Sequence, residues 1–163
     1  MSRQLTALLA VDVGVRTGLA GFSREGCLLW WSSRNFGSVA RLRRGADALL
    51  GELPALSYLV VEGDGRLAEI WRKQARTRQL AFHWVSAETW REELLLQRQR
   101  RSGEQAKATA VELARVRVRE AGLAPPRALG HDAAEAILVG LWAGVHFLDT
   151  PWQPDGHDPA TSG

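Results

Sequence analysis

Two apolar segments of strand length each carry a single carboxylate near their end, and this pattern limits the folds open to the chain. The first is LTALLAVDV, residues 5–13, which contains Asp12, and the second is YLVVE, residues 58–62, which ends at Glu62. A carboxylate among apolar neighbours is costly to desolvate unless a cation or strong hydrogen-bond donors compensate it. A helix predicted between the two strands allows them to lie side by side and parallel, which would bring both acids to one edge of a sheet.

The rest of the sequence predicts further short strands and several amphipathic helices. Apolar runs bounded by turn-forming residues predict five strands, at residues 5–13, 19–23, 27–33, 58–62 and 81–85. Apolar residues at helical spacing, with Ser86 and Ser102 as expected N-caps, indicate helices at residues 39–53, 67–80, 87–96, 103–120 and 131–148. This order of elements indicates an α/β domain in which helices flank a mixed five-stranded sheet.

The length of 163 residues suits one domain, which we place at residues 1–148. The polar residues 149–163, rich in Pro and Gly, predict a disordered tail. Asp12 interrupts the first apolar run before it reaches the length of a signal or membrane segment. The single cysteine, Cys27, cannot form an internal disulfide and is expected to be a small core residue. These features favour a reducing, cytoplasmic location and no membrane partner.

Two further acids, Asp132 and Glu135, lie three residues apart and share one face at the start of the last predicted helix. Each acid also has an ordinary interpretation, because Asp132 suits a helix start and an acid at a strand end often belongs to a turn. Four carboxylates brought together would repel one another unless cations were present. Carboxylate oxygens suit Mg²⁺ or Mn²⁺, and two such ions about 3.5–4 Å apart can stabilise both oxygens of phosphodiester cleavage. The acids therefore predict a metal-dependent site that acts on nucleic acid.

The positive charge is concentrated in one part of the chain. The whole sequence has 21 Lys and Arg residues against 18 Asp and Glu, whereas residues 66–120 hold 13 basic and 7 acidic side chains. Nearly all the basic residues are arginine, whose guanidinium group binds phosphate oxygens in a fork. This segment is either a solvated helical surface or a surface that contacts the phosphates of a nucleic acid.

Four segments, in this order, resemble sequence blocks of the RuvC-type nucleases of the RNase H-like superfamily. The segments are AVDVGVRTGLAG at residues 10–21, YLVVEG at 58–63, SGEQAKATAVELA at 102–114 and HDAAEAILVG at 131–140. The resemblance implies an RNase H-like fold and a homodimeric endonuclease that binds four-way (Holliday) DNA junctions. It also implies symmetric hydrolysis of two strands by water, with two Mg²⁺ or Mn²⁺ ions in each active site.

The resemblance also implies roles for individual residues. The residues that correspond to metal ligands are Asp12, Glu62, Asp132 and Glu135, and Lys107 corresponds to a group that contacts or stabilises the scissile phosphate. His131 is either a further metal ligand, a proton donor to the leaving oxygen or a structural residue at the helix start. The residues expected to contact nucleic acid are Arg66, Trp71, Arg72, Lys73, Arg76, Arg98, Arg100 and Arg101.

The sequence departs from the bacterial resolvase pattern near these acids. The last acid is Glu135, where those enzymes commonly have aspartate, and no aromatic residue follows shortly after Glu62. The nearby candidates to replace that aromatic are Arg66, Trp71 and Arg72. The candidates for a second basic residue before the loop at Gly103 are Arg91 and Arg98.

The tryptophans divide into two groups by their neighbours in the sequence. Those within apolar segments are expected in the core, namely Trp30, Trp84 and Trp142. Those beside arginines are expected either to stack on bases or sugars or to lie in a dimer interface, namely Trp71 and Trp90.

Three other functions share part of this pattern. An RNase H-like nuclease that processes structured RNA, of the pre-ribosomal RNA type, would use the same acids and would prefer A-form RNA. A non-catalytic junction-binding module would gain nothing from clustered negative charge beside phosphates. A sugar kinase or actin-like ATPase has a similar Asp-x-Gly hairpin, but those folds need two domains and the chain is too short.

Overall fold

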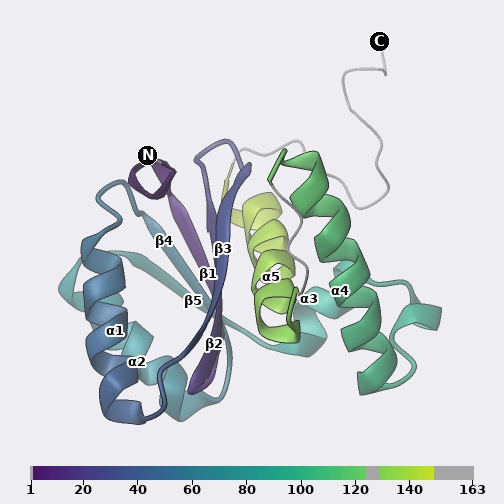
Figure 1. The fold of residues 1–163 in the computed structure, drawn as a ribbon, viewed down its shortest axis with the longest axis horizontal. Helices are drawn as coiled ribbons and strands as arrows, with labels where there is room; N and C mark the ends of the chain where they lie inside the picture. The colour runs from purple at the N-terminus through teal and green to yellow at the C-terminus, as the bar shows by residue number, and fades with distance from the viewer. Residues whose placement is uncertain (1, 124–128, 149–163) are drawn as a thin grey trace.

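A mixed sheet of five strands forms the centre of the computed structural model, which describes residues 2–123 and 129–148 (Figure 1). The strands are β1 (Leu8–Val13), β2 (Arg16–Phe22), β3 (Leu28–Asn35), β4 (Tyr58–Gly63) and β5 (Ala81–Val85). Their order across the sheet is β3-β2-β1-β4-β5. The pairs β1–β2 and β2–β3 are antiparallel, whereas β1–β4 and β4–β5 are parallel. The predicted five strands and mixed sheet are confirmed.

Helices cover both faces of this sheet (Figure 1). On one face lie α1 (Val39–Gly51) and α2 (Gly65–Thr77), and on the other lie α3 (Ala87–Leu94), α4 (Gly103–Glu120) and α5 (His131–Phe147). Two short 3₁₀ helices complete the described elements, η1 (Arg3–Leu5) and η2 (Gln97–Gln99). The segment between the predicted helices at residues 87–96 and 103–120 thus contains one helical turn, η2.

The helices begin where the capping residues predict. The side-chain oxygens of Ser86 and Ser102 accept hydrogen bonds from backbone amides of the first turns of α3 and α4. The carboxylate of Asp64 does the same for α2, accepting from the amides of Arg66 and Leu67. Asp64 is therefore the turn and cap residue that its position after a strand favours.

Alternation along the strands divides the core into two layers. In β1, Leu9 and Val11 pack with α1 and α2, whereas Leu8 and Ala10 pack with α5. The central helix α5 is buried along most of its length, because it lies between the sheet on one side and α3 and α4 on the other. This alternation directs the side chain of Asp12, two residues after Ala10, toward α5.

Several expectations about individual side chains are wrong. Trp71 and Trp90 have no exposed surface, so neither side chain is available to stack on a base. Trp84 is 53% exposed instead of buried, because β5 is an edge strand with one neighbour. Cys27 is exposed, because it lies in the turn before β3 and not within that strand. Trp30 and Trp142 are half-buried and pack against the two core layers, as expected.

No helix among the described residues has the length and apolar character needed to cross a membrane. The tail predicted for residues 149–163 lies outside the described residues.

Candidate metal centre

The first two predicted acids face each other across the central pair of parallel strands. In the register of β1 and β4, the Cα atom of Asp12 pairs with that of Glu62. Because side chains alternate between the faces of a sheet, partners in a parallel pair project to the same face. Ala10 and Val60, which lie two positions before Asp12 and Glu62 and therefore face the same side of the sheet, pack with α5. Both carboxyl groups thus project toward this helix.

The third acid comes from the first turns of α5. One carboxylate oxygen each from Asp12, Glu62 and Glu135 lies within 4.8 Å of the others. Glu135 is buried, and Asp12 and Glu62 are half-buried. Three acids that are separated by up to 123 positions in the sequence therefore form one cluster, which we call the carboxylate cluster.

A close backbone contact fixes the start of α5 against the sheet. Gly18 of β2 pairs with Asp12 in the sheet register. A Cβ atom on Gly18 would overlap the backbone carbonyl of Asp132, so only glycine permits α5 to approach β2 this closely. The absence of a side chain at Gly18 therefore contributes to the placement of Glu135 beside Asp12.

A second glycine turns the chain immediately after Glu62. Gly63 has φ +125°, a conformation that other residues rarely adopt, and a Cβ atom there would also press on Val13. The tight turn leads directly into Asp64, the N-cap of α2. It allows Glu62 to remain in the strand register while the chain departs on the opposite face of the sheet.

The carboxylate cluster is electrostatically unfavourable in the absence of a cation. Burial, a hydrogen bond with Glu62 and the negative charges of Glu135, Glu62 and Asp132 raise the pKa of Asp12 to about 10. Burial and the charge of Glu135 also raise the pKa of Glu62, although the hydrogen bond with Asp12 and the charge of Arg91 oppose this. Without a metal, therefore, Asp12 retains a proton at neutral pH. The three carboxylates lie near the C-terminal ends of β1 and β4 and provide hard oxygen donors. Such donors suit Mg²⁺ or Mn²⁺.

The fourth predicted ligand, Asp132, lies next to this cluster without belonging to it. Its carboxylate pairs with the guanidinium of Arg16, with 3.4 Å between Oδ2 and Nε. Its negative charge still contributes to the raised pKa of Asp12, which means that it lies near the cluster. The structure thus brings three of the four predicted acids together, and the ion pair with Arg16 occupies the fourth.

Lys107 and His131 line one hollow near the start of α4. The hollow has a volume of about 530 Å³, and Gly103, Glu104 and Ala108 complete its lining. Lys107 and His131 are both exposed. Since His131 directly precedes Asp132, this hollow adjoins the end of α5 that carries the acids.

The predicted nucleic-acid residues fall into two groups on opposite faces of the sheet. One group lies between α3 and α4, on the face that carries the carboxylate cluster, and comprises Arg98, Arg100 and Arg101. The other lies on α2, on the opposite face, and its exposed members are Arg66, Arg72, Lys73 and Arg76. The buried Trp71 is excluded from this second group.

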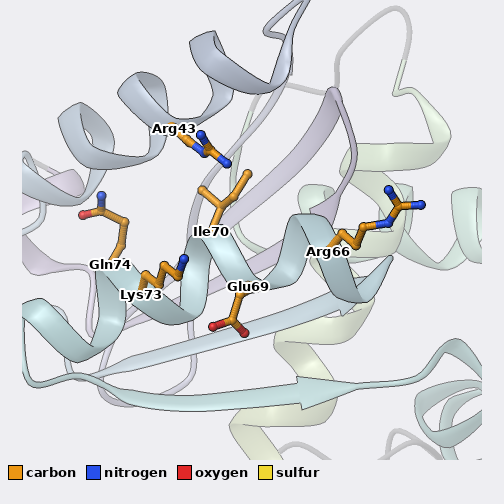
Figure 2. Close-up of a pocket in the computed structure, with 6 residues that line it drawn as sticks. All are labelled: Arg43, Arg66, Glu69, Ile70, Lys73 and Gln74. Atoms are coloured by element: carbon orange, nitrogen blue, oxygen red, sulfur yellow. The ribbon is translucent and has the colours of Figure 1, made fainter.

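The cations of α2 lie partly around a second hollow, between α1 and α2. Its volume is about 220 Å³, and it is lined by Arg43, Arg66, Glu69, Ile70, Lys73 and Gln74. Figure 2 shows Arg43 of α1 close to Ile70 of α2, and Arg66 at the N-terminal end of α2. The sheet separates this hollow from the carboxylate cluster.

The sequence did not predict the partner of Arg91. Arg91 was only one of two candidates for a second basic residue, yet its guanidinium lies 2.5 Å from the carboxylate of Glu135 (Nη2 to Oε1). The signal in the sequence was the family resemblance, which made Arg91 a candidate basic residue but gave no partner for it. The contact itself joins residues 44 positions apart.

Comparison with known proteins identifies a solved structure with a similar fold. It is T. thermophilus RuvC in complex with a Holliday junction substrate, which aligns with a TM-score of 0.57 and 15% sequence identity. The alignment covers 82% of this chain and 89% of that chain. No model of a known protein family matches the sequence, and no curated protein is a significant match. The similarity establishes an RNase H-like fold for this chain.

Proposed function

We propose that this protein is a metal-dependent endonuclease that hydrolyses phosphodiester bonds in four-way DNA junctions. The observation that carries the proposal is the meeting of Asp12, Glu62 and Glu135 at one edge of an RNase H-like sheet. Burial and the negative charge of Glu135 raise the pKa of Asp12 and of Glu62, and a divalent cation would offset this concentration of negative charge. The four sequence segments that resemble RuvC-type nucleases include all three acids.

The residues of the cluster would hold Mg²⁺ or Mn²⁺, which supplies Lewis-acid stabilisation of the phosphate and the leaving oxygen when bound. Asp132 would join them as a ligand after releasing Arg16, and Glu135 would do so after releasing Arg91. Water would be the nucleophile in this scheme, because a bound divalent ion lowers the pKa of a coordinated water. His131 is the nearest histidine in sequence to these acids, and we assign it the transfer of a proton to the leaving oxygen.

The cationic residues would bind the phosphates around the scissile bond. Lys107, exposed in the hollow beside His131, would contact the scissile phosphate itself. Arg98, Arg100 and Arg101 lie on the same face of the sheet as the acids and would contact neighbouring phosphates. The exposed cations of α2 would reach a second arm of a branched substrate, because they lie on the other side of the sheet. Two copies related by a twofold axis would place two such sites on opposed strands.

The proposal is tested with a labelled four-way DNA junction, a linear duplex and a structured RNA, each incubated with Mg²⁺ or with a chelator. Paired, symmetric nicks in the junction that require Mg²⁺ support the proposal. Selective cleavage of the RNA would instead identify the RNA-processing type of nuclease. Junction binding without cleavage in Mg²⁺ and in Mn²⁺ would contradict the proposal, and it would identify a binding module. Sedimentation of the protein, alone and with the junction, tests the proposed dimer.

A further inference from the structure

Arg91 places a positive charge inside the carboxylate cluster. Its Nη2 atom donates a hydrogen bond to Oε1 of Glu135 at 2.5 Å, and the two side chains are 20% and 11% exposed. Ion pairs with this little exposure interact more strongly than surface pairs, because solvent screens them less. The remaining ion pairs of the described residues are more exposed on at least one side.

The position of Arg91 is built into the fold. Trp90 is fully buried and holds α3 in the core layer that contains α5. The guanidinium carbon of Arg91 lies 5.2 Å from the centre of the Trp90 ring, a cation–π contact that helps to hold the side chain. The fold therefore presents Arg91 to Glu135 in the absence of any metal.

The charges of the cluster balance with a single divalent ion. Asp12, Glu62 and Glu135 carry three negative charges when ionised, and Arg91 supplies one positive charge. Asp132 is balanced separately by Arg16. One divalent ion neutralises the remainder, whereas a second ion without a bound phosphate would leave the centre with excess positive charge.

Arg91 also has an alternative position available. The Nε atom of Arg91 is buried and has no hydrogen-bond partner among the described residues, so its present position leaves one donor unsatisfied. Arg91 also lines a hollow of about 220 Å³, together with Glu88, Arg100, Ser102, Gly103 and Ala106. Glu88 precedes Arg91 by three residues on α3, which puts the two on one face of the helix. The hollow thus offers both space and a carboxylate for the guanidinium.

We propose that the guanidinium of Arg91 serves as a resident cation of the carboxylate cluster, so that the free protein binds one divalent ion and gains a second site only when Arg91 releases Glu135. This inference rests on the proposed function, since it takes the cluster to be a metal centre. Arg91 acts here as a positioning residue, because it controls access of a metal to Glu135. A phosphate that enters the hollow would draw Arg91 away and would open the second site together with the substrate.

The number of ions bound tests this inference without any measurement of cleavage. Mn²⁺ is titrated into the full-length protein in the absence of nucleic acid, and free Mn²⁺ is followed by its electron paramagnetic resonance signal. We expect one ion per chain for the parent protein. For Arg91→Gln we expect a second ion, or a gain in affinity of about tenfold or more, because the competing charge is gone. Arg91→Lys, which keeps the charge, is expected to bind one ion.

Two further variants control the experiment. Arg44→Gln removes an exposed arginine of α1, on the opposite face of the sheet, and it should bind Mn²⁺ as the parent does. In a Glu135→Gln background the additional change Arg91→Gln should raise Mn²⁺ affinity less than it does in the parent, because the carboxylate that pairs with Arg91 is absent and only the effect of Arg91 on Glu62 remains. Circular dichroism checks that each variant is folded.

The outcomes separate this inference from the proposed function. If the parent binds two equivalent ions, or if Arg91→Gln changes neither the number of bound Mn²⁺ ions nor their affinity, the inference about Arg91 is wrong. The proposed metal centre is not contradicted by either result. If the folded parent binds no Mn²⁺, the metal centre itself is wrong, and the inference fails with it.

Discussion

Asp12 and Glu62 are direct partners in the parallel pairing of β1 and β4, and their carboxyl groups share the face of the sheet beneath α5. A parallel pair of central strands normally carries apolar residues on both faces, because helices cover both. Here a pair of acids occupies one such position. The cost is visible in the raised pKa of Asp12, and the same arrangement makes a cation favourable.

Replacement of Asp12 should abolish cleavage and leave binding of the junction largely intact. Loss of a residue that merely supports a metal ligand costs 10–100-fold, so we expect Asp12→Asn to reduce the cleavage rate by more than about 100-fold. Single-turnover cleavage and fluorescence anisotropy measure the two effects. Glu112→Gln is a matched control, because Glu112 is an exposed acid of α4 whose partner is Arg115. Loss of binding by a folded Asp12→Asn protein would contradict the assigned role.

The stability of the metal-free protein should depend on pH through Asp12. In the unfolded chain an aspartate has a pKa of about 3.9, whereas in the fold the pKa of Asp12 is about 10. Between these values the folded protein keeps a proton that the unfolded chain has released, so the free energy of unfolding falls as pH rises. This contribution is at most about 1.4 kcal/mol per pH unit.

Urea denaturation in the presence of a chelator, repeated at several pH values, measures this dependence. Asp12→Asn cannot ionise, so its free energy of unfolding should fall less steeply with pH. At mildly alkaline pH the variant should be more stable than the parent. Equal slopes for the two proteins would mean that Asp12 is ionised in the folded, metal-free state.

A methyl group at Gly18 should disturb the carboxylate cluster, because it would displace the start of α5. The Cβ atom of Gly18→Ala would overlap the backbone carbonyl of Asp132, and overpacking of this kind costs about 1–3 kcal/mol. The start of α5 must shift, so we also expect weaker Mn²⁺ binding. Gly51→Ala is the matched control, because no atom lies within 4 Å of a Cβ at Gly51. Chemical denaturation and Mn²⁺ titration of both variants test this prediction. If the two variants have the same stability and the same Mn²⁺ affinity, α5 does not approach β2 closely at Gly18.

The arginines between α3 and α4 should contribute to the salt dependence of junction binding. Each phosphate contact releases counterions, and the slope of log K against log salt changes by about 0.9 per contact. The double variant Arg100→Gln, Arg101→Gln should therefore lower the slope by about 2 if both contact phosphate. Arg44→Gln on α1, outside the predicted surface, should leave the slope unchanged. An unchanged slope in the double variant would remove this segment from the interface.

Much of the fold follows from local patterns in the sequence. Strand β5 lies at the predicted residues 81–85, and the start of α4 after Ser102 is as expected. Apolar spacing and capping residues act within one helical turn or one strand, so neighbouring residues suffice to predict them. The pairing of Asp12 with Glu62 could also be predicted from the sequence, because a helix between two strands favours a parallel pair.

The burial of individual side chains could be known only from the tertiary structure. Trp71 lies beside Arg72 in the sequence, but neighbours on a helix point in directions about 100° apart, and the fold turns Trp71 inward. Trp84 follows an apolar pattern yet is exposed, because its burial depends on whether another strand lies beyond β5.

The sequence by itself determined which elements form and which residue types are available for a metal centre, because both depend on local chemistry. The tertiary structure alone decided that Glu135 lies with Asp12 and Glu62 while Asp132 pairs with Arg16, and that Arg91 contacts Glu135. These contacts join residues far apart in the chain. Their geometry depends on how closely α5 packs against the sheet and α3 against α5, and the close approach of α5 requires that Gly18 has no side chain.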